Sequence, residues 1–247
     1  MSRGRTVHGN AAAGLGAILL ALGLVLGAAT SSQAADDTSI APATENLPGV
    51  PAPGSPASEW EAWAAQERAD AEATDWAADA KARGCILKDV TISAEVDADY
   101  NRAMGAPADL ATHRVDLLEE CGDAPAQAAR AATSGTSTLS LPSGNQCEAT
   151  SGPGTMCLTK GSGRIYASWQ YRGSGSVTGF LRIYRISSGA DGCPTGTTWL
   201  TGADGTWRSG DTRTISKTRT TAGGYSAHIW KKVTFGHTDW GGACATL

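Results

Sequence analysis

The side chains best suited to acid–base or nucleophilic chemistry are sparse in this 247-residue sequence and match no known catalytic pattern. His113, His228 and His237 are the histidines outside the N-terminal region. Asp239 follows His237 closely, and Ser226 would complete a Ser-His-Asp set, but the spacing fits no triad motif. Gly-x-Ser-x-Gly, His-Glu-x-x-His and P-loop motifs are absent. We therefore predict no catalytic residue, no metal ligand and no cofactor.

Aromatic side chains are concentrated toward the C-terminus and give a stronger indication of function. Five of the eight tryptophans lie in the last two fifths of the chain. Alternation along a strand places Trp230 on one face with His228 and Lys232, and Tyr184 beside Arg182. Rings stack on sugars, and a cationic rim suits an anionic polymer such as a cell-wall glycan. We predict a ligand-binding face of six residues, unless a second sheet or the preceding helices cover it: Tyr184, Arg182, Trp230, His228, Lys232 and Trp240.

Such a face requires a sheet, and the sequence from residue 147 onward has the two-residue period of β-strands. Short strands with Gly-rich turns between them favour an antiparallel sandwich or small barrel. In the last strand, Ile229, Val233 and Phe235 are expected on the buried face. Strands are expected at 155–160, 164–171, 177–187, 197–201, 212–221 and 225–235. The chain is thus predicted to be mainly β, with a disulfide-stapled domain at residues 147–247.

A small acidic helical segment is expected to precede this domain, at residues 58–122. Ser58 and Glu61 have the spacing of a capping box. The longer stretch that contains this segment, residues 36–135, carries 19 acidic and seven basic side chains, whereas residues 136–247 carry five acidic and 11 basic ones. Opposite charges favour docking of the helices on the basic β domain. Helices are expected at 59–83, 94–104 and 107–120.

The N-terminal region has the pattern of a secretory signal peptide at residues 1–34. Two arginines precede an apolar run, and Ser32 and Ala34 suit a signal peptidase site. A membrane anchor is the alternative, but no basic flank follows the run. A disordered Pro-rich tether is expected at 35–57, and a linker open to proteases at 123–146. We predict a secreted, extracellular protein with no nucleic-acid partner and no stable membrane insertion after signal cleavage.

Six cysteines in an exported chain predict disulfide bonds. No Cys-x-x-Cys pair occurs, so zinc and thioredoxin-like sites are not indicated. The two bridges of the C-terminal domain could equally be exchanged. Pairing within each segment gives Cys85–Cys121, Cys147–Cys157 and Cys193–Cys244.

The Ala/Gly-rich signal region, the Pro-rich tether and the Gly/Thr-rich β domain with its many tryptophans together resemble uncharacterised secreted proteins of high-GC actinobacteria. The resemblance is one of composition. It implies export from a Gram-positive cell, and it assigns no activity and no site residue.

Three hypotheses about function remain open. The first is a non-enzymatic binding protein for cell-wall or environmental glycans, which would be retained on insoluble polysaccharide. The second is a bacteriocin-like or toxin domain masked by an acidic pro-region, which would be cleaved within 123–146. The third is an inhibitor of extracellular hydrolases, which would capture a protease.

Overall fold

The computed structural model describes residues 46–122 and 141–247, which belong to one compact unit. The predicted signal peptide, the first part of the tether and most of the linker lie outside the described residues. Within the described part of the chain, no helix is long and apolar enough to cross a membrane.

The described chain contains three helices and 11 strands, and every pairing between these strands is antiparallel. The helices are α1 (Ala57–Ala73), α2 (Trp76–Ala82) and α3 (Ala98–Met104). The strands are β1 (Cys85–Val96), β2 (Ala111–Cys121), β3 (Gln146–Ala149), β4 (Gly154–Gly161), β5 (Arg164–Tyr171), β6 (Ser176–Ile186), β7 (Thr197–Thr201), β8 (Gly205–Arg208), β9 (Asp211–Thr218), β10 (Gly224–Lys232) and β11 (His237–Thr246).

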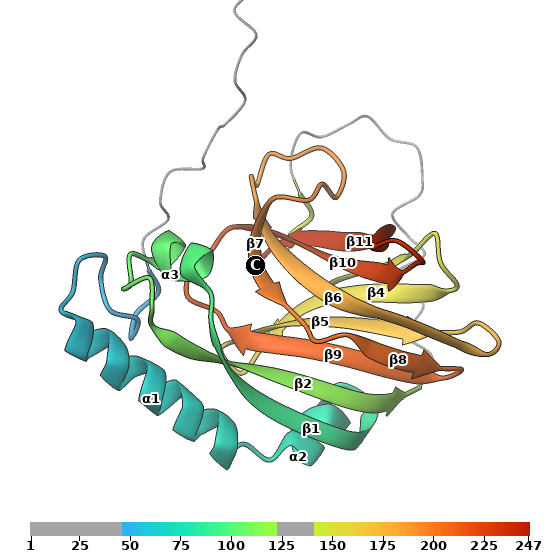
Figure 1. Ribbon diagram of the computed structural model, residues 1–247, viewed down its shortest axis with the longest axis horizontal. Coiled ribbons are helices and arrows are strands. Elements are labelled where there is room, and N and C mark those ends of the chain that lie inside the picture. Colours follow the sequence, from blue (N-terminus) through green and yellow to red (C-terminus); the bar gives the residue numbers. More distant parts are fainter. Residues whose placement is uncertain (1–45, 123–140) are drawn as a thin grey trace, which may run out of the picture. The chain divides into compact units, whose positions relative to one another are not determined.

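The strands form two sheets that share a core, as expected for a β-sandwich (Figure 1). One sheet has six strands in the order β1-β2-β9-β5-β4-β3. The other has the order β11-β10-β6-β7, with β8 paired to β6. The principal core takes buried side chains from both sheets, including Trp169 on β5, Trp199 on β7 and Ile229 on β10. The prediction of a mainly β, antiparallel fold is confirmed.

Helices α1 and α2 cover part of the outer face of the six-stranded sheet, beside β1 and β2 (Figure 1). Ala71 and Trp76 pack there against Val115, Leu117 and Tyr166 in a second apolar cluster. This burial stabilises helices whose own apolar stripe is thin. The remainder of the same face, over β4 and part of β5, carries no helix and is the location of the groove described below.

The helix predicted at 59–83 is present as two helices, because Thr74 and Asp75 interrupt the helical conformation between α1 and α2. The predicted capping box is wrong: α1 begins at Ala57, so Ser58 lies within its first turn. A different residue caps the second helix, since Asp75 accepts a hydrogen bond from the backbone N–H of Ala78 at 3.0 Å.

The helix predicted at 94–104 is confirmed for residues 98–104, with Gly105 as its stop, whereas the helix predicted at 107–120 is wrong. β1 continues to Val96, and only α3 is helical, ending at Gly105 with a φ of 75°. The second stretch forms β2 instead. Its buried side chains Val115 and Leu117 alternate with less buried ones, and β2 pairs with β1 on one side and β9 on the other. Strand pairing and alternating burial therefore outweigh a composition rich in helix formers.

The predicted division into a helical segment at 58–122 and a separate β domain is wrong, because β2 is a strand of the six-stranded sheet. β2 pairs with β9 from Val115↔Ser216 to Glu120↔Asp211, so strands before and after residues 123–140 share one sheet.

The tether prediction is also wrong for residues 46–56. Asn46 Nδ2 donates hydrogen bonds to the carbonyl oxygens of Pro51 and Met104, at 2.7 and 3.0 Å, which holds this stretch against the fold.

The strands predicted from residue 147 onward are largely confirmed, and those at 164–171 and 197–201 have the bounds of β5 and β7. The sequence does not predict β3, β8 or β11. The prediction is wrong at the end of β10, which stops at Lys232. Val233 and Phe235 lie in the turn that follows, where they are 39% and 94% exposed.

All three predicted disulfides are present. Cys85–Cys121 and Cys147–Cys157 each join residues that lie directly opposite each other on neighbouring strands, β1 with β2 and β3 with β4. Cys193–Cys244 ties the loop between β6 and β7 to β11. The first two bridges therefore fix strands of the six-stranded sheet, and the third fixes a loop of the other sheet.

Candidate ligand-binding groove

The predicted aromatic face is partly assembled on the outer side of the five-stranded sheet. Arg182 on β6 lies opposite His228 on β10. The guanidinium carbon of Arg182 is 6.0 Å from the ring centre of Tyr184 and 5.9 Å from that of Trp230. Phe180, which the predicted set lacks, is closer still at 4.8 Å. Four of the six predicted residues thus lie together.

The other two predicted residues lie elsewhere. Lys232 is exposed and forms an ion pair with Asp204 at 3.2 Å. Trp240 packs against the principal core, with its ring centre 5.8 Å from that of Trp169. Neither side chain contributes to the cluster around Arg182.

Most of the ring surface in this aromatic cluster is covered. Phe180, Tyr184 and His228 are only 9%, 3% and 4% exposed, and Trp230 and Arg182 are half-buried. A sugar needs an open ring face to stack on. The cluster therefore offers a ligand little more than the edge of Trp230 and the Arg182 guanidinium.

His228 has an acidic partner, but no catalytic triad forms around it. Its Nδ1 lies 2.9 Å from Asp239 Oδ2. Ser226 Oγ donates to the carbonyl oxygen of Pro194 at 2.7 Å. A nucleophilic serine must instead give its proton to the imidazole, so this arrangement does not activate Ser226.

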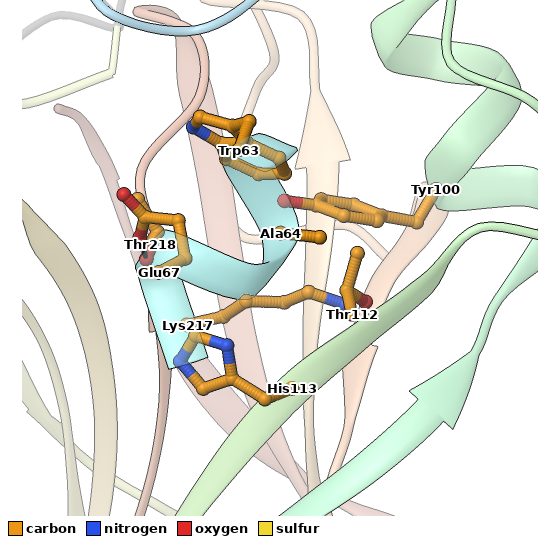
Figure 2. Close-up of a pocket in the computed structure, with 8 residues that line it drawn as sticks. All are labelled: Trp63, Ala64, Glu67, Tyr100, Thr112, His113, Lys217 and Thr218. Atoms are coloured by element: carbon orange, nitrogen blue, oxygen red, sulfur yellow. Dashed lines mark hydrogen bonds between the residues drawn. The ribbon is translucent and has the colours of Figure 1, made fainter. Parts of the chain in front are cut away.

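A polar cluster is buried between α1, β2 and β9 (Figure 2). It surrounds a cavity of about 10 Å³, which has room for one water molecule. Lys217 Nζ lies 2.8 Å from Glu95 Oε1 and 3.7 Å from the ring centre of Tyr100. Burial, followed by the positive charges of Arg164 and Lys217, lowers the pKa of His113 to about 4. These groups contact one another, so the cluster holds α1 against the sheet.

The larger concavity is a groove of about 510 Å³ on the outer face of the six-stranded sheet, which we call the sheet groove. Its volume lies in the range of about 300–1,000 Å³ that is typical of ligand sites. β4, β5 and β9 contribute its floor, and the end of α2 and the start of β3 form its sides. Both cross-strand disulfides, Cys85–Cys121 and Cys147–Cys157, line it. Its accessible polar lining includes Asn145, Gln146, Thr155, Thr159, Lys160 and Ser168.

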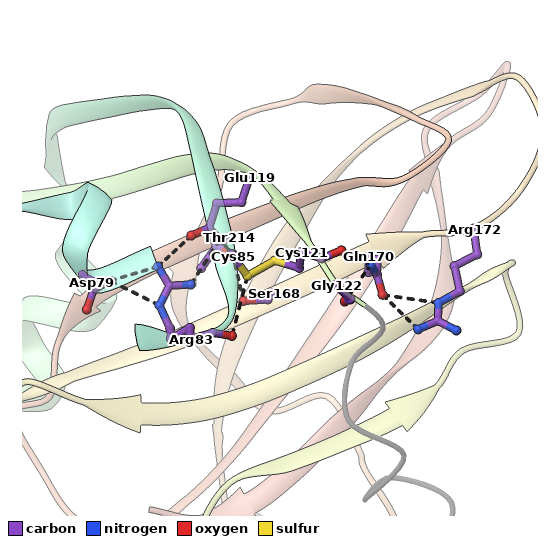
Figure 3. The surroundings of a disulfide bond; sticks show 10 residues. All are labelled: Asp79, Arg83, Cys85, Glu119, Cys121, Gly122, Ser168, Gln170, Arg172 and Thr214. Carbon is purple, nitrogen blue, oxygen red and sulfur yellow. Dashed lines mark hydrogen bonds and ion pairs between the residues drawn. A yellow bond between two sulfur atoms is a disulfide. The ribbon is translucent and has the colours of Figure 1, made fainter. Parts of the chain in front are cut away.

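The side of the sheet groove at Cys85–Cys121 is held by a network of charged groups (Figure 3). Arg83 donates to both carboxylate oxygens of Glu119, at 2.7 and 3.1 Å, and pairs with Asp79 at 2.9 Å. Burial alone would lower the pKa of Arg83, but Glu119 and Asp79 together raise it. The same guanidinium lies 4.9 Å from the ring centre of Tyr166. These contacts fix the wall where α2 ends.

The network sets the direction of a hydrogen bond on the groove floor. The Glu119 carboxylate, paired with Arg83, can only accept, so Thr214 Oγ1 donates to it at 2.6 Å. Thr214 Oγ1 then accepts from Ser168 Oγ, which lies 2.8 Å away. Ser168 has no second proton. It therefore presents only an acceptor to whatever enters the groove.

Two further threonines extend the polar floor along β4. Thr155 and Thr159 are half-buried and line the groove with hydroxyls that can donate or accept. Thr212 on β9 is 2% exposed, and its hydroxyl has no partner among the described residues. A buried hydroxyl is normally hydrogen-bonded, so this atom indicates a place for water or a ligand group.

The charges of the groove balance one another. Asp79 on the wall and Glu119, buried behind it, are negative, whereas Arg83 and the exposed Lys160 are positive. Because this sum is zero and three of the four groups are already paired, the groove gives no preference for a charged ligand. This differs from the aromatic cluster, where Arg182 would favour an anion.

Cys85, Cys121 and Glu119 bring three ligand-type atoms within 4.8 Å of one another. The two sulfurs are bonded to each other, and the carboxylate is held by Arg83. Metal ions bind thiolates, which a disulfide does not offer. The cluster in its disulfide form therefore does not fit a metal ion.

No local motif in the sequence marks the sheet groove, because its lining comes from stretches that are far apart in the chain. The available signal was the pairing of Cys85 with Cys121 and of Cys147 with Cys157, since both bridges flank one site. No protein-family model, no curated protein and no solved structure matches this chain.

Proposed function

We propose that this protein is a secreted, non-enzymatic binding protein that takes a neutral, hydroxyl-rich glycan into the sheet groove. The observation that supports this most directly is a floor of hydroxyl and amide groups between two disulfide-bonded walls, in a volume of about 510 Å³. Sugars carry closely spaced hydroxyls that both donate and accept, which suits such a floor. Three disulfides fit an extracellular role.

The floor residues have different roles in this proposal. Ser168 presents only an acceptor and so selects a ligand hydroxyl that donates. Thr155 and Thr159 can pair with hydroxyls of either direction. The disulfides and the Arg83 network hold the floor rigid, so binding loses little conformational entropy at the site.

A removable acidic pro-region is less well supported. Loss of residues 58–122 would remove β1 and β2, which pair through β2 with β9, and would expose a long strand edge. It would also remove Trp60 and Tyr100 from the principal core. Such a loss disrupts the fold rather than uncovering a finished domain.

The test is binding of residues 38–247 to an array of neutral and acidic oligosaccharides, followed by retention on the corresponding insoluble polysaccharide. The groove variant replaces Thr155 and Thr159 with Val, which keeps the shape and removes the hydroxyls. Two lost hydrogen bonds at about 1 kcal/mol each predict a roughly 30-fold weaker Kd. Thr178→Val is the matched control, because the Thr178 hydroxyl lies on the other sheet, where it bonds Thr206.

The expected result is binding to one or more neutral glycans that the groove variant loses and the control retains. Equal binding by the groove variant and the control would place the glycan elsewhere, with the Arg182 cluster as the next site to test. Absence of binding to every glycan on the array would contradict the proposal.

A further inference from the structure

The turn between β10 and β11 carries two exposed apolar side chains. Val233 is 39% exposed and Phe235 is 94% exposed. A single exposed apolar residue needs no explanation, but two in a four-residue turn form a small apolar tip. We call residues 233–236 the hairpin tip.

A backbone hydrogen bond closes the hairpin tip beyond the last strand pair. The N–H of Val233 donates to the carbonyl oxygen of Gly236 at 3.0 Å, and Gly236 has a φ of 88°. The last paired residues of the two strands are Lys232 and His237. Phe235 therefore lies in the turn, past the end of the paired strands.

Cationic and aromatic side chains surround the base of the hairpin tip. Lys231 Nζ lies 4.8 Å from the ring centre of Trp240, and Lys232 follows it toward the tip. Trp230 lies half-buried behind Lys232. Asp204 is paired with Lys232 at 3.2 Å. Tryptophans and lysines behind a projecting phenylalanine are the combination found in proteins that rest on membrane interfaces.

We propose that the hairpin tip docks on an anionic lipid surface. Phe235 is 94% exposed past the last strand pair, so its ring can enter the boundary between headgroups and acyl chains, at a depth of about 5–10 Å, while Lys231 and Lys232 stay at the level of the headgroups. One phenylalanine cannot anchor the chain permanently, so attachment is peripheral and reversible. Lys231 and Lys232 at the base of the hairpin tip support an anionic surface over a neutral one.

The experiment is co-sedimentation of residues 38–247 with vesicles. This unit contains all the described residues and omits the apolar run near the N-terminus, which would bind lipid by itself. Vesicles of equimolar phosphatidylglycerol and phosphatidylcholine are compared with vesicles of phosphatidylcholine, at low and high salt. Phe235→Ala should weaken binding about tenfold or more, because the variant loses the burial of a phenylalanine ring in the bilayer. Ile86→Ala is the matched control, since Ile86 is 69% exposed on β1.

The expected result is binding to the anionic vesicles that high salt weakens, that Phe235→Ala loses, and that Ile86→Ala and Phe235→Trp retain. No binding of the unaltered protein would overturn the proposal and leave an apolar pocket of a protein partner as the occupant of the tip. Equal binding by the Phe235→Ala variant would also overturn it. The Thr155 and Thr159 variant should bind vesicles normally, so failure of the glycan proposal would remain distinguishable.

Discussion

His113 is predicted to make the fold sensitive to mild acid. The side chain is 4% exposed between α1 and the sheet. Burial is the main cause of its lowered pKa, and the positive charges of Arg164, Lys217 and Arg68 lower it further, opposed by Glu72. Protonation in place would add a buried cation beside two others. His113→Gln removes the titration and keeps a polar side chain near Arg164.

The size of the effect follows from the two pKa values. Unfolded histidine titrates near 6.5, whereas the pKa of His113 in the folded protein is about 4. Below about pH 6.5 the unfolded chain therefore takes up a proton that the folded chain does not, and the free energy of unfolding falls as the pH falls toward 4. Between pH 7 and pH 5 the loss from this one group amounts to about 2 kcal/mol.

The assay is urea unfolding of the unaltered protein and the His113→Gln variant at pH 7, 6 and 5, with disulfides intact. Carboxylates titrate in both proteins, so the difference in slope against pH isolates His113. The unaltered protein should lose about 2 kcal/mol more than the variant over this range. Parallel pH profiles for the two proteins would refute the buried, neutral state of His113 and the seating of α1 upon it.

Two further predictions concern the covalent and non-covalent links in the sheet. Alanine replacement of both cysteines of Cys85–Cys121, which closes a loop of 36 residues, should lower the free energy of unfolding by about 4 kcal/mol. The same change at Cys147–Cys157, which closes a loop of 10 residues, should lower it by about 3 kcal/mol. Urea unfolding measures both losses. A protease cut within 123–140 should leave the two fragments associated on size-exclusion chromatography until denaturant is added, because β2 remains paired with β9 and no disulfide joins the fragments; separation without denaturant would contradict the shared sheet.

The parts of the fold that were predictable are those with strong local signals. Alternation of large apolar residues around Trp169 gives β5 with its observed bounds. Cysteine positions within segments give all three bridges. The short strands β3 and β8 have four residues each and are polar or Gly-rich, so alternation alone could not reveal them.

The parts that were not predictable depend on partners distant in the chain. β2 contains Arg, Leu and Glu, which favour helices, yet its buried Glu119 is stabilised by Arg83 and Thr214. Thr214 is far from residue 119 in the chain, so the sequence alone predicts that this carboxylate lies on a solvated helix face. The end of β10 was misplaced for a related reason: alternation continues past Lys232, but Gly236 closes a turn there and leaves Phe235 in solvent.

The charge difference between the two halves of the chain also bears on how the molecule would lie on an anionic surface. The halves are interleaved in one sheet, and Glu95 of the acidic half pairs with Lys217 of the basic half at 2.8 Å. Acidic residues of α1 such as Glu59 and Glu61 nevertheless remain exposed on the outer side of the six-stranded sheet, while Lys231 and Lys232 lie on the other sheet near the hairpin tip. An anionic surface would attract the second region and repel the first. Because the sheet groove opens on the same sheet that α1 covers, docking through the hairpin tip would leave the groove free to bind its ligand.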